Sequence, residues 1–120
     1  MTMKITNKTR KTVIADNAKE ARSFLSRARG LMLARTPQTL VITAPDQSIE
    51  ETSIHMWFML FPIDVIWLDS RLKVVDTFKG AKPWSFRIFR PELSAKYVVE
   101  CPVGTITKTK TRAEDDFSFG

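Results

Sequence analysis

Apolar residues gather most densely in the middle of this chain, from Met56 to Leu68. The run is interrupted by Pro62 and by a single carboxylate, Asp64. Because proline cannot donate a hydrogen bond to a central sheet ladder, we expect two strands, 53–60 and 63–68, with a bend between them. Both faces of the second strand are apolar, which predicts that protein covers it on both sides.

Shorter strand-like segments surround this run. The segments that we expect to form strands are 11–15, 39–43, 72–78 and 95–100, and 103–107 is a candidate for one more. A turn at 69–71 would join the strands 63–68 and 72–78 into a hairpin. The acidic segment 114–116 is typical of a solvated chain end.

One segment has the periodicity of a helix. Asn17 followed by Glu20 resembles a capping box, and Gly30 supplies a C-terminal stop. The apolar residues that recur at helical spacing are Ala18, Ala21, Phe24, Leu25, Ala28 and Met32. The pattern predicts one amphipathic helix over residues 17–29.

Together these elements predict an α+β fold in a single domain, residues 1–120. Its strands are mainly antiparallel and form a coiled sheet or a partly open barrel, with the one main amphipathic helix packed on it. A chain of 120 residues is long enough to bury a core without disulfides or metals.

Composition and charge restrict the partners. Lys and Arg number 19 against 13 Asp and Glu, and the net charge of +6 favours anionic partners. These charges are spread along the chain, so they are no strong evidence for nucleic acid. The single cysteine, Cys101, excludes an internal disulfide and fits a cytoplasmic location. No signal sequence or membrane-spanning run is visible, and we expect no membrane partner.

Asp64 is the first candidate for a site, because an ionised carboxylate among apolar neighbours needs hydrogen-bond partners. It can act as an acid, a base or a ligand anchor. Alternatively, it accepts backbone N–H bonds and holds the bend at Pro62. His55 is the only histidine, and it is either an acid–base partner of Asp64 or a packed side chain.

The long connection 80–96 is the second candidate. Here Trp84 and Phe86 alternate with Lys82 and Arg87, which suits a single-stranded nucleic acid or another anionic ligand. In the alternative, Trp84, Phe86 and Ile88 point inward as a strand and the arginines only solvate it.

Several segments, taken in order, resemble the family called domain of unknown function 192. They are Gly30-Leu31-Met32 followed by Arg35, Phe61–Asp69, Val74-Val75, Lys82-Pro83, and Ala95–Glu100 with Gly104. The chain departs from the family at His55–Leu60, where many members carry a Trp-Met-Lys-Asn-Thr-like segment. The resemblance implies a small, mainly β domain of bacteria and archaea, without an established activity.

The chain contains no nucleophile elbow, phosphate loop, dinucleotide fingerprint or cluster of metal ligands. We therefore assign no catalytic residue, metal or cofactor. We expect a non-catalytic ligand-binding or accessory module whose site lies near Asp64, His55, Lys82 and Trp84 and whose partner is a small molecule or a protein. The alternatives are a small enzyme that uses Asp64 with His55, and a weak binder of single-stranded nucleic acid.

Overall fold

The structure is a computed structural model that describes residues 2–21, 30–32 and 34–120. In this part of the chain, seven strands form one sheet with the order β5-β4-β6-β3-β2-β1-β7. The strands are β1 (Thr2–Asn7), β2 (Thr12–Ala21), β3 (Leu40–Ser48), β4 (Ile63–Leu68), β5 (Val74–Ala81), β6 (Ala95–Pro102) and β7 (Phe117–Phe119). The short helix α2 (Thr105–Thr109) lies between β6 and β7 in the chain.

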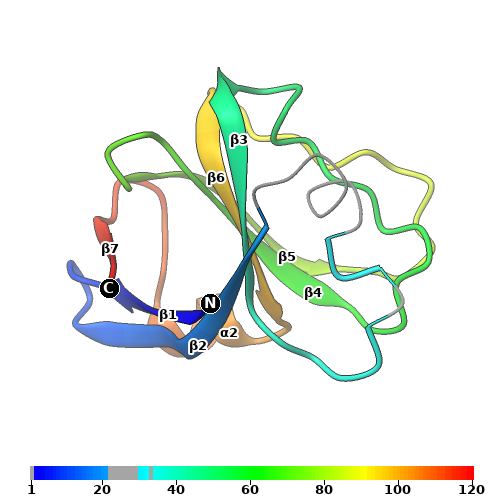
Figure 1. The fold of residues 1–120 in the computed structure, drawn as a ribbon, viewed down its shortest axis with the longest axis horizontal. Coiled ribbons are helices and arrows are strands. Elements are labelled where there is room, and N and C mark those ends of the chain that lie inside the picture. The colour runs from blue at the N-terminus through cyan, green and yellow to red at the C-terminus, as the bar shows by residue number, and fades with distance from the viewer. Residues whose placement is uncertain (1, 22–29, 33) are drawn as a thin grey trace.

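The sheet curls strongly into a half-barrel (Figure 1). The bridge between Lys73 and Asp116 brings the chain before β7 next to the start of β5. All neighbouring strands are antiparallel except β2 and β3, which are parallel. The expected α+β class with a mainly antiparallel, curled sheet is confirmed at this level.

β4 is the buried centre of the fold, because all six of its residues are buried. Ile63, Val65 and Trp67 belong to one apolar cluster, and Ile66 and Leu68 belong to a second. The predicted strand 63–68, covered on both faces, is therefore confirmed. The two clusters lie on opposite faces of β4 and β6, since neighbouring residues of a strand point in opposite directions.

The expected strands 39–43, 72–78 and 95–100 correspond to β3, most of β5, and β6. The expected strand 11–15 corresponds to the start of β2. The strand expected at 53–60 is wrong. Ile54 alone forms a bridge there, with Phe89, and Phe58 has a left-handed backbone with φ +61°. The segment is apolar because its buried side chains cover the first cluster from a loop, which needs no strand alternation.

The candidate strand 103–107 is also wrong, because Gly104 turns the chain at φ +97° and α2 begins directly after it. The prediction of one main amphipathic helix over 17–29 is wrong for residues 17–21, which belong to β2. The rest of that range, residues 22–29, lies outside the described part of the chain. No helix of the described residues is long and apolar enough to cross a membrane.

Bulges explain why β2 resembles a helix in sequence. Between the pairs Met3↔Ala18 and Thr6↔Val13, β1 advances by three residues and β2 by five. The extra residues of β2 break its strict alternation. As a result its buried positions are Ile14, Ala18 and Ala21, whose spacing of four and three is that of a helix.

The terminal strands β1 and β7 pair with each other, which the sequence pattern did not indicate. The expectation of a solvated tail at 114–116 is wrong for Asp115, which is buried. Its Oδ2 accepts hydrogen bonds from Asn7 Nδ2 at 3.0 Å and Arg10 Nε at 3.1 Å. The acidic segment therefore anchors the end of the chain to β1.

Candidate functional site

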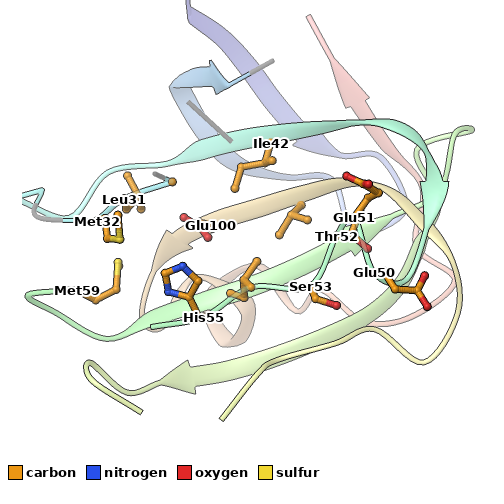
Figure 2. A pocket seen from close by; sticks show the side chains of 13 residues that line it. Leu31, Met32, Ile42, Glu50, Glu51, Thr52, Ser53, His55, Met59 and Glu100 are labelled. Carbon is orange, nitrogen blue, oxygen red and sulfur yellow. The ribbon is translucent and has the colours of Figure 1, made fainter. Parts of the chain in front are cut away.

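A cavity of about 350 Å³ opens on the side of the sheet that carries the first apolar cluster. Its walls come from the turn at 30–32, from β3 and β6, and from the loop 50–59 (Figure 2). The lining residues are Gly30, Leu31, Met32, Ile42, Glu50, Glu51, Thr52, Ser53, Ile54, His55, Met59, Val98 and Glu100. Apolar and polar side chains share the wall, and the polar ones decide which chemical groups it can recognise.

Glu100 is the most unusual of these polar groups. It lies on β6, only 5% exposed, between Val99 and Cys101, which both belong to the second cluster. Strand alternation therefore turns Glu100 toward the cavity. Burial raises the pKa of Glu100 to about 7, although a hydrogen bond from the Leu31 N–H lowers it in part.

One oxygen of this carboxylate, Oε1, is buried without a hydrogen-bond partner among the described residues. Nearly all buried polar atoms in native proteins are hydrogen-bonded, so an orphan of this kind needs an explanation. A carboxyl group whose pKa is near 7 can accept a hydrogen bond when ionised and can donate one when protonated.

The turn at Gly30 fits closely over Glu100. Gly30 has φ +52°, and a Cβ atom at this position would lie 3.1 Å from Glu100 Oε1. Two features favour glycine at this position. The backbone is left-handed, and the nearby carboxylate leaves little room for a Cβ atom. Leu31, the next residue, is buried and provides the N–H that binds the same carboxylate.

His55 is half-buried and lies on the wall of the same cavity (Figure 2). Its Nδ1 accepts a hydrogen bond from the Trp57 N–H at 3.2 Å, and the two rings are in contact. Because Nδ1 is an acceptor, the neutral ring carries its proton on Nε2. His55 can therefore offer a donor to a molecule in the cavity.

Asp64 lies on the opposite face of the sheet, because it shares the orientation of Ile66 and Leu68 in the second cluster. It is 1% exposed and accepts backbone N–H bonds from Gly80 at 2.9 Å, Gly104 at 3.1 Å and Ile106 at 2.9 Å. The expected acceptance of backbone N–H bonds is confirmed. These bonds hold β5 and the start of α2, not the bend at Pro62.

Asp64 and His55 are consequently not brought together, since His55 lines the cavity and Asp64 does not. Lys82 and Trp84 also lie outside the cavity lining, on the exposed loop after β5. A role of Asp64, Lys82 or Trp84 in ligand binding stays a prediction.

The alternative in which the 80–96 connection packs inward as a strand is wrong. Trp84 is 53% exposed, Phe86 is 90% exposed and Ile88 is 42% exposed. Phe89 is the aromatic residue of this segment that is buried, and it contacts Phe78 with a ring-centroid distance of 4.8 Å.

Sequence reasoning missed Glu100 and the role of Gly30. The signal for Glu100 was present, because it is a carboxylate between Val99 and Cys101 in an apolar strand, just as Asp64 lies between Ile63 and Val65. The described residues contain no group of three or more His, Cys, Asp and Glu side chains that could hold a metal ion.

Comparisons with known proteins give a consistent result. The chain is 43% identical over 116 residues to a UPF0127 protein of Thermococcus kodakarensis, covering 96% of this chain and 72% of the relative. It is 47% identical over 116 residues to a UPF0127 protein of Thermococcus gammatolerans, covering 96% of this chain and 74% of the relative. A crystal structure of a protein of unknown function from Novosphingobium aromaticivorans has the same fold, with a TM-score of 0.85 and 15% identity, covering 98% of this chain and 84% of that chain.

The profile of the family DUF192, described as uncharacterized ACR, matches residues 3–119. This range includes nearly the whole chain, with the Gly30 turn, β4 and β6. The resemblance noted in the sequence is thereby confirmed, and the chain belongs to the DUF192 family, a family of small domains without an established function.

Proposed function

We propose that this domain is a non-catalytic binding module that holds a small organic molecule in the cavity between the 30–32 turn and the 50–59 loop. The observation that carries the proposal is Oε1 of Glu100, which is buried at the cavity wall and has no hydrogen-bond partner in the described part of the chain. A bound molecule with a polar group at this position would complete the hydrogen bonding of the carboxyl group.

The size and lining of the cavity support a small ligand with an apolar body. Its volume of about 350 Å³ is at the lower end of the range for small-molecule sites. Leu31, Ile42, Ile54, Met59 and Val98 provide apolar contact area (Figure 2). Burial of that area supplies the affinity, and the polar groups fix the orientation.

Two polar groups would orient the ligand. Glu100 acts as acceptor or donor according to its protonation, and His55 donates from Nε2. Binding is favoured over acid–base catalysis by Asp64 with His55 because His55 lines the cavity and Asp64 lies on the opposite face of the sheet. An acid and a base that act together must both reach one bound substrate.

Thermal-shift screening of small organic molecules tests the proposal. A compound that fits should raise the melting temperature of the wild-type protein and have much less effect on Glu100→Gln. Glu92→Gln, a change at an exposed carboxylate on another loop, is the matched control and should respond like the wild type. A compound that stabilises all three proteins equally would contradict the assigned site, and a crystal structure with the compound bound elsewhere would do so directly.

We also infer a cytoplasmic location from the single cysteine. Cys101 is fully buried in the second cluster, and burial raises the pKa of its thiol, so it is held as an unreactive thiol. A free buried thiol suits a reducing compartment.

A further inference from the structure

Two loops next to the cavity expose an unusual amount of apolar surface. We call this the loop surface, and it consists of Trp57, Phe58, Leu60, Trp84, Phe86, Ile88 and Leu93. Each of these side chains is at least 42% exposed, and Phe86 reaches 90%. Large exposed apolar patches on folded proteins mark contacts with other proteins or with membranes.

The two loops that form the loop surface are held together by backbone and side-chain contacts. The Trp84 N–H donates to the Met56 carbonyl at 2.9 Å, and Ile54 forms a bridge with Phe89. The rings of Phe58 and Trp84 meet edge to face with a centroid distance of 5.0 Å. The green loop around residue 57 and the yellow loop around residue 86 lie at the same end of the molecule (Figure 1).

The backbone of both loops carries strain at their aromatic residues. Phe58 has φ +61° and Trp84 has φ +60°, a conformation that bulky side chains rarely adopt. Left-handed non-glycine residues persist only where the surrounding structure holds them, and they cluster at functional segments. The contact between these two rings is thus maintained at a conformational cost.

One of the two loops is positively charged, whereas the loop 50–60 has no Lys or Arg and carries Glu50 and Glu51. Lys79, Lys82, Arg87 and Arg90 lie in the segment 77–91, which contains no aspartate or glutamate. The Arg87 guanidinium lies 4.7 Å from the ring centroids of both Phe78 and Phe89, so its charge is held at the surface. An anionic partner is therefore complementary to the segment 77–91 of the loop surface.

We propose that the loop surface docks on an anionic lipid bilayer, with its aromatic and aliphatic side chains in the interfacial region and its basic side chains on the headgroups. Aromatic side chains flanked by Lys and Arg favour this boundary. The rings enter the apolar side of the interface, and the basic groups stay in the hydrated headgroup layer. The expectation of no membrane partner came from the lack of a spanning segment, and a peripheral surface needs none.

A single-stranded nucleic acid explains the loop surface less well. Bases stack on aromatic side chains, but Leu60, Ile88 and Leu93 offer no ring on which to stack. These three residues are 42% to 60% exposed, so they form a substantial part of the apolar surface. A lipid interface uses aliphatic and aromatic groups alike.

Co-sedimentation with vesicles tests this proposal on the full chain. Vesicles of phosphatidylcholine mixed with phosphatidylglycerol should retain the protein, and vesicles of phosphatidylcholine alone should retain much less. High salt should weaken the retention, because it screens surface charges. The tryptophan emission should shift to shorter wavelength on binding, since Trp57 and Trp84 would leave water.

Variants locate the surface. Phe86→Ser with Leu60→Ser should lower the partition coefficient by about tenfold or more, because each removes most of an apolar side chain from the interface. Val13→Ser with Val103→Ser is the matched control, since both valines are exposed outside the loop surface. Lys79→Glu with Lys82→Glu should lower the partition coefficient by at least about tenfold, since each basic residue near an anionic surface increases this coefficient by about fivefold. Lys8→Glu with Lys108→Glu, which alters exposed lysines elsewhere, should have a much smaller effect.

The proposal is overturned if anionic vesicles do not retain the protein, or if the control pairs lose binding as much as the loop variants. It is also overturned if an oligonucleotide binds the loop surface and displaces the protein from vesicles. Glu100→Gln should bind vesicles like the wild type, so failure of this docking and failure of the pocket proposal are separate results.

Discussion

At the scale of single residues, two buried carboxylates on adjacent strands differ in their hydrogen-bond partners, although both are almost fully buried. Asp64 on β4 is paired with Cys101 and Glu100 on β6 with Val65, so the two acids point to opposite faces. Asp64 accepts three backbone N–H bonds, whereas one oxygen of Glu100 has no partner among the residues that the structure describes.

The need of Asp64 for partners could be predicted from its apolar neighbours, and the same reasoning would have found Glu100. The identity of the partners could not be predicted. The N–H groups that bind Asp64 are 16, 40 and 42 residues away in the chain, and only the folded topology brings them together. Local periodicity carries no information on such distances.

Asp64→Asn should destabilise the fold by about 2–4 kcal/mol, because the amide NH₂ group would face backbone N–H donors and leave them unpaired. Chemical denaturation measures the change. Asp46→Asn, at an exposed position of β3, is the control and should change the free energy of unfolding by less than about 0.5 kcal/mol. An Asp64→Asn protein as stable as this control would refute the structural role of Asp64.

Glu100→Gln should change how stability depends on pH. The pKa of Glu100 rises from an ordinary value of 4.5 to about 7 on folding, so the folded state binds more protons between these values. The wild type should therefore lose stability as the pH rises from about 4.5 to about 7, by on the order of 3 kcal/mol. Glutamine does not ionise, so the free energy of unfolding of the variant should rise relative to that of the wild type as the pH increases across this window. Parallel stability curves for the two proteins would contradict the raised pKa.

At the scale of elements, β4 and β6 could be predicted because their apolar runs are long and continuous, whereas only the start of β2, within the expected strand 11–15, could be. The bulges of β2 move its buried positions to the spacing of a helix, and only the pairing with β1 reveals them. In the loop 53–60, apolar side chains cover the core without strand pairing. Hydrophobic periodicity therefore fails where tertiary contacts break the regular ladder.

The turn at residues 30–32 provides a test at this scale. Gly30→Ala should destabilise the protein by about 1–2 kcal/mol, because alanine is strained at φ +52° and its Cβ would press on the Glu100 carboxylate. Gly120→Ala should leave the stability unchanged, since nothing lies within 4 Å of a Cβ there. Unfolding curves that coincide for the two variants would contradict the described packing of the turn on Glu100.

At the scale of the whole molecule, the two chain ends close one side of the curled sheet. β7 pairs with β1, and the segment before β7 is anchored by Asp115. Burial raises the pKa of Asp115, but hydrogen bonds from Asn7, Arg10 and Arg112 outweigh this and hold the pKa below its ordinary value. This contribution to stability is present above pH 3.8 and is lost as the pH falls below it.

Asp115→Asn should therefore cost about 1–3 kcal/mol near neutral pH and progressively less in acid. Asp116→Asn is the matched control, because Asp116 forms its ion pair with Lys73 at the surface, where such pairs contribute little to stability. Urea unfolding of both variants at several pH values measures the difference. Equal losses for the two would show that Asp115 does not anchor the chain ends.

The proposed small-molecule pocket depends on the buried carboxyl group of Glu100, one oxygen of which has no partner among the described residues. The most direct measurement is a carbon-13 NMR titration of the side-chain carboxyl of Glu100 in the folded protein. The account predicts a midpoint of about 7 that shifts when a ligand occupies the cavity. A midpoint near the ordinary 4.5 would mean that Glu100 is solvated or already paired, and the proposed site would then be wrong.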